Sequence, residues 1–186
     1  MKDAGLEHLS TARLTLRRLT PADEGLLWEL NSSPAVMRYL GGPLSEAENR
    51  TMLDERILRY YGEHPGLGVW ATCERNTGRC VGFHLLNHVR GESMIQLGYR
   101  LFEQDWGKGY ASEMGVALLR YGFAELGLPQ LMANTHPDNV DSQRVLLKCG
   151  LRRKEDRAYA HPMLAPFGLM PYFERDAADW LAEFSG

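Results

Sequence analysis

The start of the chain has a strand pattern followed by two helix start signals. Residues 13–19 alternate apolar and polar side chains, which predicts a β-strand. Thr20-Pro21 supplies a preferred N-cap residue and a proline for the first helical turn, so we expect a helix through residues 26–30. Ser33-Pro34 repeats this signal and predicts a second, short helix.

The apolar pattern changes from a helical to an alternating period after residue 61. Before this point, Ser45 and Glu48 form a capping-box sequence, which predicts a helix to about residue 61. After it, residues 69–74, 80–89 and 94–101 have strand patterns separated by short turns. We expect these three strands to form an antiparallel meander.

A long helical pattern follows at residues 111–126. Met114, Leu118 and Tyr121 recur at the spacing of one helix face, so we expect them in the core. Gly127 ends the pattern, as a glycine after a helix commonly does.

The remaining segments alternate between the two types of element. We expect a strand at 131–135, a helix at 142–149, strands at 151–158 and 169–174, and a closing helix at 176–184. The order predicts an α/β (α+β) fold, with a mixed sheet and helices on both faces. The 186 residues fit one domain, 1–186.

Composition narrows the class of protein. With 44% hydrophobic residues the chain has enough apolar material for one core, and its net charge of −3 argues against nucleic acid as a partner. No apolar run approaches the roughly 20 residues that cross a bilayer, and residues 1–10 lack a signal-peptide core. We therefore expect a cytoplasmic protein without a membrane partner.

The cysteines and histidines argue against metal sites and disulfide frameworks. Cys73, Cys80 and Cys149 are odd in number and form no C-x-x-C pair. We expect three small, partly buried thiols. The six histidines show no spaced pair, so we expect no metal.

The segment 104–111 carries the clearest chemical signal. Gly107 and Gly109 lie between a predicted strand and a predicted helix, where unpaired amides and the helix dipole suit a diphosphate. An ordinary glycine-containing turn is the alternative. The P-loop pattern fails because Tyr110 follows Gly109, and the dinucleotide fingerprint fails because Ser112 replaces its third small residue.

Gln104-x-x-Gly107-x-Gly109 resembles the Q/R-x-x-G-x-G/A signature of GNAT-superfamily acetyltransferases. The longer stretch 106–113 is similar to the branch that includes ribosomal-protein N-terminal acetyltransferases. Residues 97–99 resemble the strand before the signature, and 139–150 resemble the block after it. The resemblance covers about residues 12–181 and implies the GNAT fold, a mostly antiparallel sheet splayed between its fourth and fifth strands.

The resemblance also implies acetyl-CoA as co-substrate and assigns residues to it. Backbone groups of Tyr99, Arg100 and Leu101 would pair with the pantetheine arm, and Asn139 would contact the same arm. Gln104 belongs to the signature that holds the diphosphate. The amides of the glycine segment would bind the diphosphate, with Lys108 adding charge: Gly107, Lys108, Gly109, Tyr110 and Ala111.

Acetyl transfer to an amine needs a proton acceptor and a donor for the departing thiolate. Many relatives have a carboxylate where this chain has Gln96, so the base would be another group acting through water. Glu92 and His136 are the main candidates, with His84 and Glu103 as others.

The position of the family's tyrosine acid is Leu146, which cannot donate a proton. Ser142 would therefore bond the leaving sulfur, and its alternative role is to cap a helix.

The acceptor would be a primary amine, either a protein N-terminus or a small molecule. Its pocket would be formed by the early helices, 33–61, and the apolar loop 160–168, which could equally pack on the body or on another copy in a homodimer. The alternative function is a sensor module that binds acyl-CoA without turnover.

Overall fold

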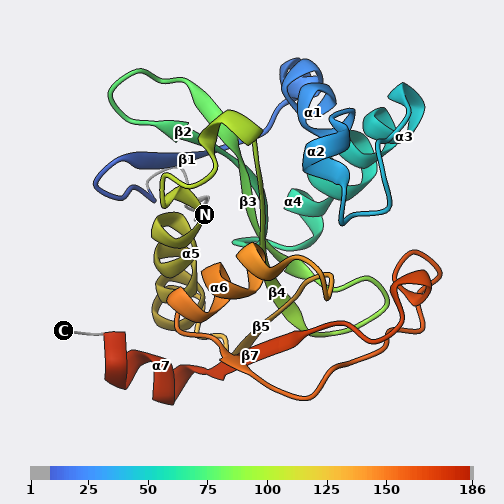
Figure 1. Ribbon diagram of the computed structural model, residues 1–186. Coiled ribbons are helices and arrows are strands. Elements are labelled where there is room, and N and C mark those ends of the chain that lie inside the picture. The colour runs from blue at the N-terminus through green and yellow to red at the C-terminus, as the bar shows by residue number, and fades with distance from the viewer. Residues whose placement is uncertain (1–8, 185–186) are drawn as a thin grey trace. The chain divides into compact units, whose positions relative to one another are not determined.

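A seven-stranded mixed sheet runs through residues 9–184, which are the residues that the computed structural model describes (Figure 1). The strand order is β1-β2-β3-β4-β5-β7-β6, with β4 and β5 parallel. This confirms the predicted α/β class and the mixed sheet. The expectation about a signal peptide at residues 1–10 lies largely outside the described residues.

The elements follow the predicted order with a few shifted bounds. The strands are β1 Leu14–Arg18, β2 Gly68–Glu74, β3 Cys80–His88, β4 Ile95–Leu101, β5 Gln130–Asn134, β6 Arg152–Arg153 and β7 Tyr172–Asp176. The α-helices are α1 Glu24–Asn31, α2 Pro34–Met37, α3 Glu46–Thr51, α4 Arg59–Glu63, α5 Tyr110–Arg120, α6 Val140–Lys148 and α7 Ala177–Phe184. Two π-helical segments, η2 Met52–Leu58 and η4 Tyr121–Glu125, extend α3 and α5, and 3-10 turns lie at η1 Pro21–Asp23, η3 Glu103–Asp105 and η5 Ala165–Phe167.

The chain divides into two compact units that draw on separated segments. Unit 1 comprises residues 1–85 and 99–114, and unit 2 comprises residues 86–98 and 115–186. The prediction of a single domain over 1–186 stays a prediction.

Unit 1 contains the early helices and the first strands. β1 and β2 pair antiparallel from Leu14 opposite Glu74 to Arg18 opposite Trp70. The helices α1 to α4 gather in one group (Figure 1), and leucines of α1 and η2 pack with Phe83 of β3 in a buried cluster. The predicted capping box is present, since Glu48 N–H donates to the Ser45 hydroxyl and Ser45 N–H donates to the Glu48 carboxylate.

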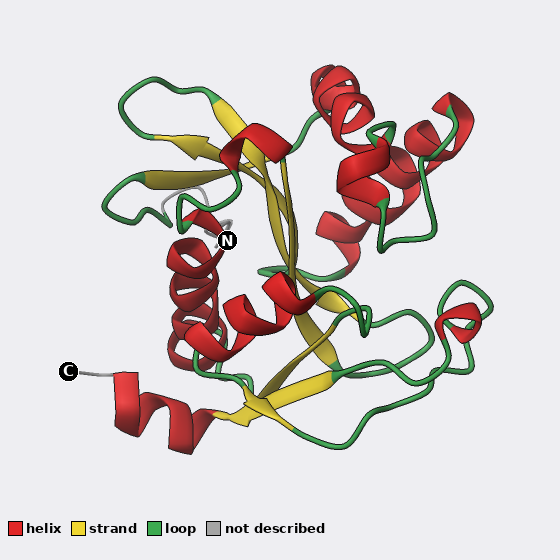
Figure 2. Cartoon of the chain, viewed as in Figure 1, coloured by secondary structure: helices red, strands yellow, loops and turns green. Residues whose placement is uncertain are grey.

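Unit 2 contains the other part of the sheet. β5 and β7 run antiparallel side by side (Figure 2), whereas the β4–β5 ladder registers a single pair, Gln96 with Met132. Such a short ladder is what the predicted splay between the fourth and fifth strands requires. The three core positions predicted for the long helix are all buried: Met114, Leu118 and Tyr121.

Two expectations were wrong. The strand predicted at 151–158 is reduced to Arg152–Arg153. Lys154 N–H still donates to the Tyr172 carbonyl, but the chain then leaves β7 and pairs again at the bridge of Arg157 with Met170. Cys73 and Cys80 are joined in a disulfide, because the tight β2–β3 hairpin brings them together. Cys149 is the buried thiol.

Candidate active site

The glycine segment forms an exposed turn at the start of α5, in unit 1. Gly107 and Gly109 have φ angles of 72° and 80°, which L-residues with a side chain rarely adopt. The first helical bond that involves this turn runs from Glu113 N–H to Gly109 O. Among described residues, no backbone acceptor binds the amides of residues 107–111. Together with the dipole of α5, these amides suit a diphosphate.

The buried carboxylate of Asp105 fixes the glycine turn through contacts with Arg79 and Lys108. Asp105, whose side chain is fully enclosed, accepts two bonds of 2.8 Å from Arg79 of the β2–β3 turn and one of 2.8 Å from the Lys108 ammonium. The hydrogen bonds from Arg79 hold the pKa of Asp105 below its usual range. The Lys108 charge is therefore paired within the protein, and we expect it to contribute less to phosphate binding than the amides do.

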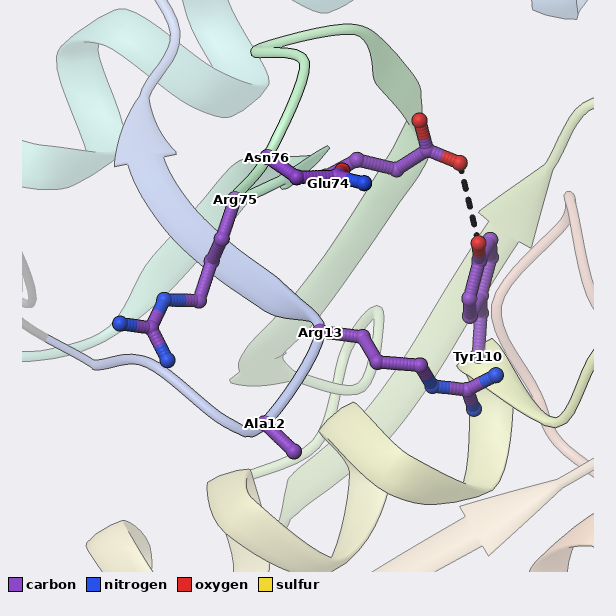
Figure 3. A pocket seen from close by; sticks show the side chains of 6 residues that line it. All are labelled: Ala12, Arg13, Glu74, Arg75, Asn76 and Tyr110. Atoms are coloured by element: carbon purple, nitrogen blue, oxygen red, sulfur yellow. Dashed lines mark hydrogen bonds between the residues drawn. The ribbon is translucent and has the colours of Figure 1, made fainter.

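A second set of contacts ties the first residue of α5 to β1 and β2. The Tyr110 hydroxyl donates to the Glu74 carboxylate over 2.9 Å, and Arg13 lies 4.7 Å from the Tyr110 ring centroid (Figure 3). Glu74 also binds Arg79, and this bond chiefly lowers the pKa of Glu74 to about 2. Glu113 fixes Arg13 over 2.6 Å. The start of the helix is thus braced by charged side chains.

The end of β4 approaches β3 very closely. A Cβ on Gly82 would lie 2.1 Å from the Arg100 carbonyl oxygen and 2.7 Å from the Leu101 Cα. The Trp106 indole donates to the Leu101 carbonyl over 2.9 Å, which links the strand end to the glycine turn. The backbone of Tyr99, Arg100 and Leu101 is therefore positioned by its neighbours in unit 1.

His84 is a core residue. It is fully buried, with its Nδ1 2.7 Å from the Thr72 hydroxyl and its Nε2 3.3 Å from the Ala111 carbonyl. Burial lowers its pKa to about 4. It supports the start of α5 and is enclosed away from solvent, so it is unsuited to receive a substrate proton. Glu103, the other secondary candidate, is exposed in η3.

The buried His84 should make stability depend on pH. Its pKa is about 4 in the folded state and about 6.5 when unfolded, so the unfolded chain binds more protons between these values. Acidification through this window therefore destabilises the fold, by about 2 kcal/mol between pH 7 and pH 5. Urea unfolding at both pH values should show this loss reduced in His84→Gln and retained in the control His161→Gln. An equal loss in wild type and His84→Gln would contradict the assignment.

In unit 2, Asn139 and Ser142 lie at the start of α6. Asn139 caps the helix, since its Oδ1 accepts the Ser142 N–H over 3.2 Å. His136 lies just before them, and its carbonyl accepts the Asn139 N–H. The Nδ1 atom of its ring accepts the Asp138 N–H, and the ring lies edge-on to that of Phe167 with 6.1 Å between the ring centroids. The expected capping role therefore belongs to Asn139 and not to Ser142.

The other candidate residues of unit 2 have partners within the protein or lie in its core. Glu92 forms an ion pair of 3.3 Å with Arg157. The Gln96 amide donates to Asn87 Oδ1 over 3.1 Å, and Leu146 is buried at 2% exposure. In the loop 160–168, Leu164 and Phe167 pack on a buried cluster of unit 2, whereas Met163 is 55% exposed.

The structure places the predicted residues Tyr99–Leu101, Gln104 and 107–111 in unit 1, and it places His136, Asn139 and Ser142 at or just before the start of α6 in unit 2. Sequence reasoning missed Arg79 and Asp105. An aspartate directly after Gln104 was visible, but its partner lies 26 residues away and no spacing rule connects the two. Within residues 9–184 no cluster of potential metal ligands occurs, and no helix could span a membrane.

Comparison with known proteins identifies the family. Residues 13–152 match the model of the acetyltransferase (GNAT) domain. The Bacillus subtilis protein described as "Uncharacterized N-acetyltransferase YoaA" is 33% identical over 78% of this chain and 83% of its own. The "FsC-acetyl coenzyme A-N(2)-transacetylase" of Aspergillus fumigatus is 30% identical over 79% of this chain and 66% of its own.

Solved structures of acetyltransferases have a similar fold. An acetyltransferase from Agrobacterium tumefaciens superposes with a TM-score of 0.77 at 28% identity, covering 89% of this chain and 92% of its own. A spermidine N-acetyltransferase from Vibrio cholerae in complex with CoA and spermine, at 16% identity, shares the fold with a TM-score of 0.72, covering 90% of this chain and 98% of its own. The chain therefore belongs to the GNAT acetyltransferase family, as an enzyme that uses acetyl-CoA as its co-substrate.

Proposed function

We propose that this enzyme transfers the acetyl group of acetyl-CoA to a primary amine by direct attack within a ternary complex. The observation that carries the proposal is the braced glycine turn, whose open amides at the start of α5 suit the diphosphate of CoA. The name of the Aspergillus relative refers to N(2)-acetylation and supports a nitrogen acceptor. The resemblance to the ribosomal-protein branch supports a protein N-terminus as one acceptor class, and a small amine is the other.

The cofactor roles follow the family pattern. The turn, with Gln104 before it and residues 107–111 along it, binds the diphosphate. The backbone of Tyr99–Leu101 pairs with the pantetheine arm, and Asn139 contacts that arm. Holding both substrates in line supplies much of the rate.

The chemistry requires one bond to form and one to break. The amine nitrogen attacks the thioester carbonyl, the C–S bond breaks, and CoA leaves as a thiol. The Ser142 hydroxyl donates a hydrogen bond to the departing sulfur, and Glu92 or His136 accepts the amine proton through water and passes it on to the thiolate, which leaves as a thiol. A backbone N–H at the end of β4 stabilises the charge that develops on the carbonyl oxygen.

An acceptor screen tests this function. Thiol release from acetyl-CoA should appear with at least one class in a panel of peptides, polyamines and amino acids, and mass spectrometry should find the amine heavier by one acetyl group. CoA binding without thiol release across the panel would instead favour an acyl-CoA sensor.

A mutation can separate the proposed donor role of Ser142 in turnover from any effect on CoA binding. Ser142→Ala should lower kcat by about tenfold or more, since a proton donor contributes on this scale, while the Kd for CoA stays within twofold. Ser93→Ala, which changes an exposed serine of the same unit, is the control. Wild-type kcat in Ser142→Ala would reject the donor role.

A further inference from the structure

Arg100 of β4 is a cation without a carboxylate partner in the described part of the chain. Its Nη1 donates to Oδ1 of Asn31, and the guanidinium lies 5.2 Å from the centroid of the Phe83 ring. Its Nε is enclosed and has no hydrogen-bond partner. Burial lowers the pKa of Arg100 to about 10, which leaves the side chain charged at neutral pH. The fold therefore holds a partly desolvated guanidinium whose Nε donor is unsatisfied.

The surroundings of Arg100 are neutral and fixed. Asn31 is fully buried and donates to Asn49 Oδ1 over 2.8 Å, and Asn49 donates to the Glu24 carbonyl over 3.3 Å. The Glu24 carboxylate is bound to Arg50 at 3.0 Å. A chain of amides thus orients Nη1 of Arg100 without neutralising its charge.

Two other arginines with enclosed contacts do have carboxylate partners. Arg79 binds Asp105 through two nitrogens, and Arg175, only 4% exposed, pairs with Glu183. Enclosing a cation is costly unless an anion compensates it. The missing anion at Arg100 therefore points to a ligand.

We propose that Arg100 binds a carboxylate of the acceptor, so that the acceptor is an amine of the amino-acid class. Nη1 is held by Asn31 and Nε is enclosed, so Nη2 is the nitrogen left to donate a charge-assisted hydrogen bond to a carboxylate. The inference rests on the proposed function, since the backbone of Tyr99–Leu101 is there assigned to the pantetheine arm. The arginine side chain then belongs to the same stretch of strand that is assigned to the pantetheine arm.

Matched pairs of acceptors test the proposal. L-amino acids and their carboxamides share the primary amine and differ in the carboxylate, so the carboxamide reports on that group alone. Wild type should acetylate the best free amino acid at least about tenfold more efficiently than its carboxamide, with the difference in the KM for acceptor. Arg100→Met should abolish this preference, and Arg100→Lys should retain part of it.

Binding of the acetylated products to the wild-type enzyme tests the carboxylate site without turnover and without a variant. The N-acetylated forms of the same pairs are titrated calorimetrically into the CoA-loaded wild-type enzyme, and the N-acetyl amino acids should bind at least about tenfold more tightly than their amides. If the wild-type enzyme acetylates amino acids and their carboxamides equally well, and binds the two N-acetylated forms equally tightly, the proposed role of Arg100 is overturned. Acetyl transfer to an amine would still stand. Absence of transfer to any amine, with the acid still bound more tightly, would overturn the proposed function and leave the carboxylate site in place.

Discussion

Gly109→Trp is expected to abolish acetyl-CoA binding, with Kd raised by at least about a hundredfold. The φ of Gly109 is 80°, and a Cβ there would already lie 3.4 Å from Nη2 of Arg13. An indole at this position would occupy the space in front of the amides that we assign to the diphosphate. Calorimetric titration with CoA measures the effect directly.

The control for this variant is Gly127→Trp. Gly127 also has a positive φ, 65°, and open space around its Cβ position, but it follows η4 and is far along the chain from the proposed cofactor residues. Each variant should lose roughly 1–2 kcal/mol of unfolding free energy from backbone strain. Only Gly109→Trp should lose CoA. Wild-type affinity in Gly109→Trp would remove the turn from the cofactor site.

Gly82→Ala is expected to lower the unfolding free energy by at least about 3 kcal/mol, on the scale of severe overpacking. The added methyl carbon would lie 2.1 Å from the Arg100 carbonyl oxygen, at a φ of 141°. Because the obstacle is backbone, no rotamer change relieves it. Urea unfolding measures the loss, and CoA titration should show weaker binding because the displaced segment is the proposed pantetheine strand.

Gly25→Ala separates this steric effect from the general effect of adding a methyl group. Gly25 lies in α1 with nothing within 4 Å of its Cβ position, so alanine should stabilise the helix by about 0.5–1 kcal/mol. Comparable stability of Gly82→Ala and wild type would show that β3 and β4 can separate without cost.

The two glycine positions differ in how far the sequence predicts them. Gly107 and Gly109 are recognisable because a glycine pair before a helical pattern has a local meaning. Gly82 lies inside an apolar strand pattern and carries no such signal, since its importance comes from the backbone of a different strand. A single sequence holds no information about that approach until the strands are paired.

The same distinction applies to the surroundings of individual side chains. The sequence places Lys108 between the two glycines, but it does not show that the buried Asp105 binds Lys108 at 2.8 Å. Cys73 and Cys80 have no motif spacing, yet the hairpin makes them neighbours. His84 has a suitable ordinary pKa for a base, but the surrounding core encloses it and shifts that value downward.

The amino-acid sequence by itself determined the order of strands and helices, the core face of the long helix and the glycine turn. These features depend on contacts between residues a few positions apart, which periodicity and capping chemistry report directly. Tertiary structure alone decided the Arg79–Asp105 brace, the burial of His84 and the solitary charge of Arg100. Each of these depends on which distant segments pack together, because a charge acquires its partner, or lacks one, only when the chain has folded.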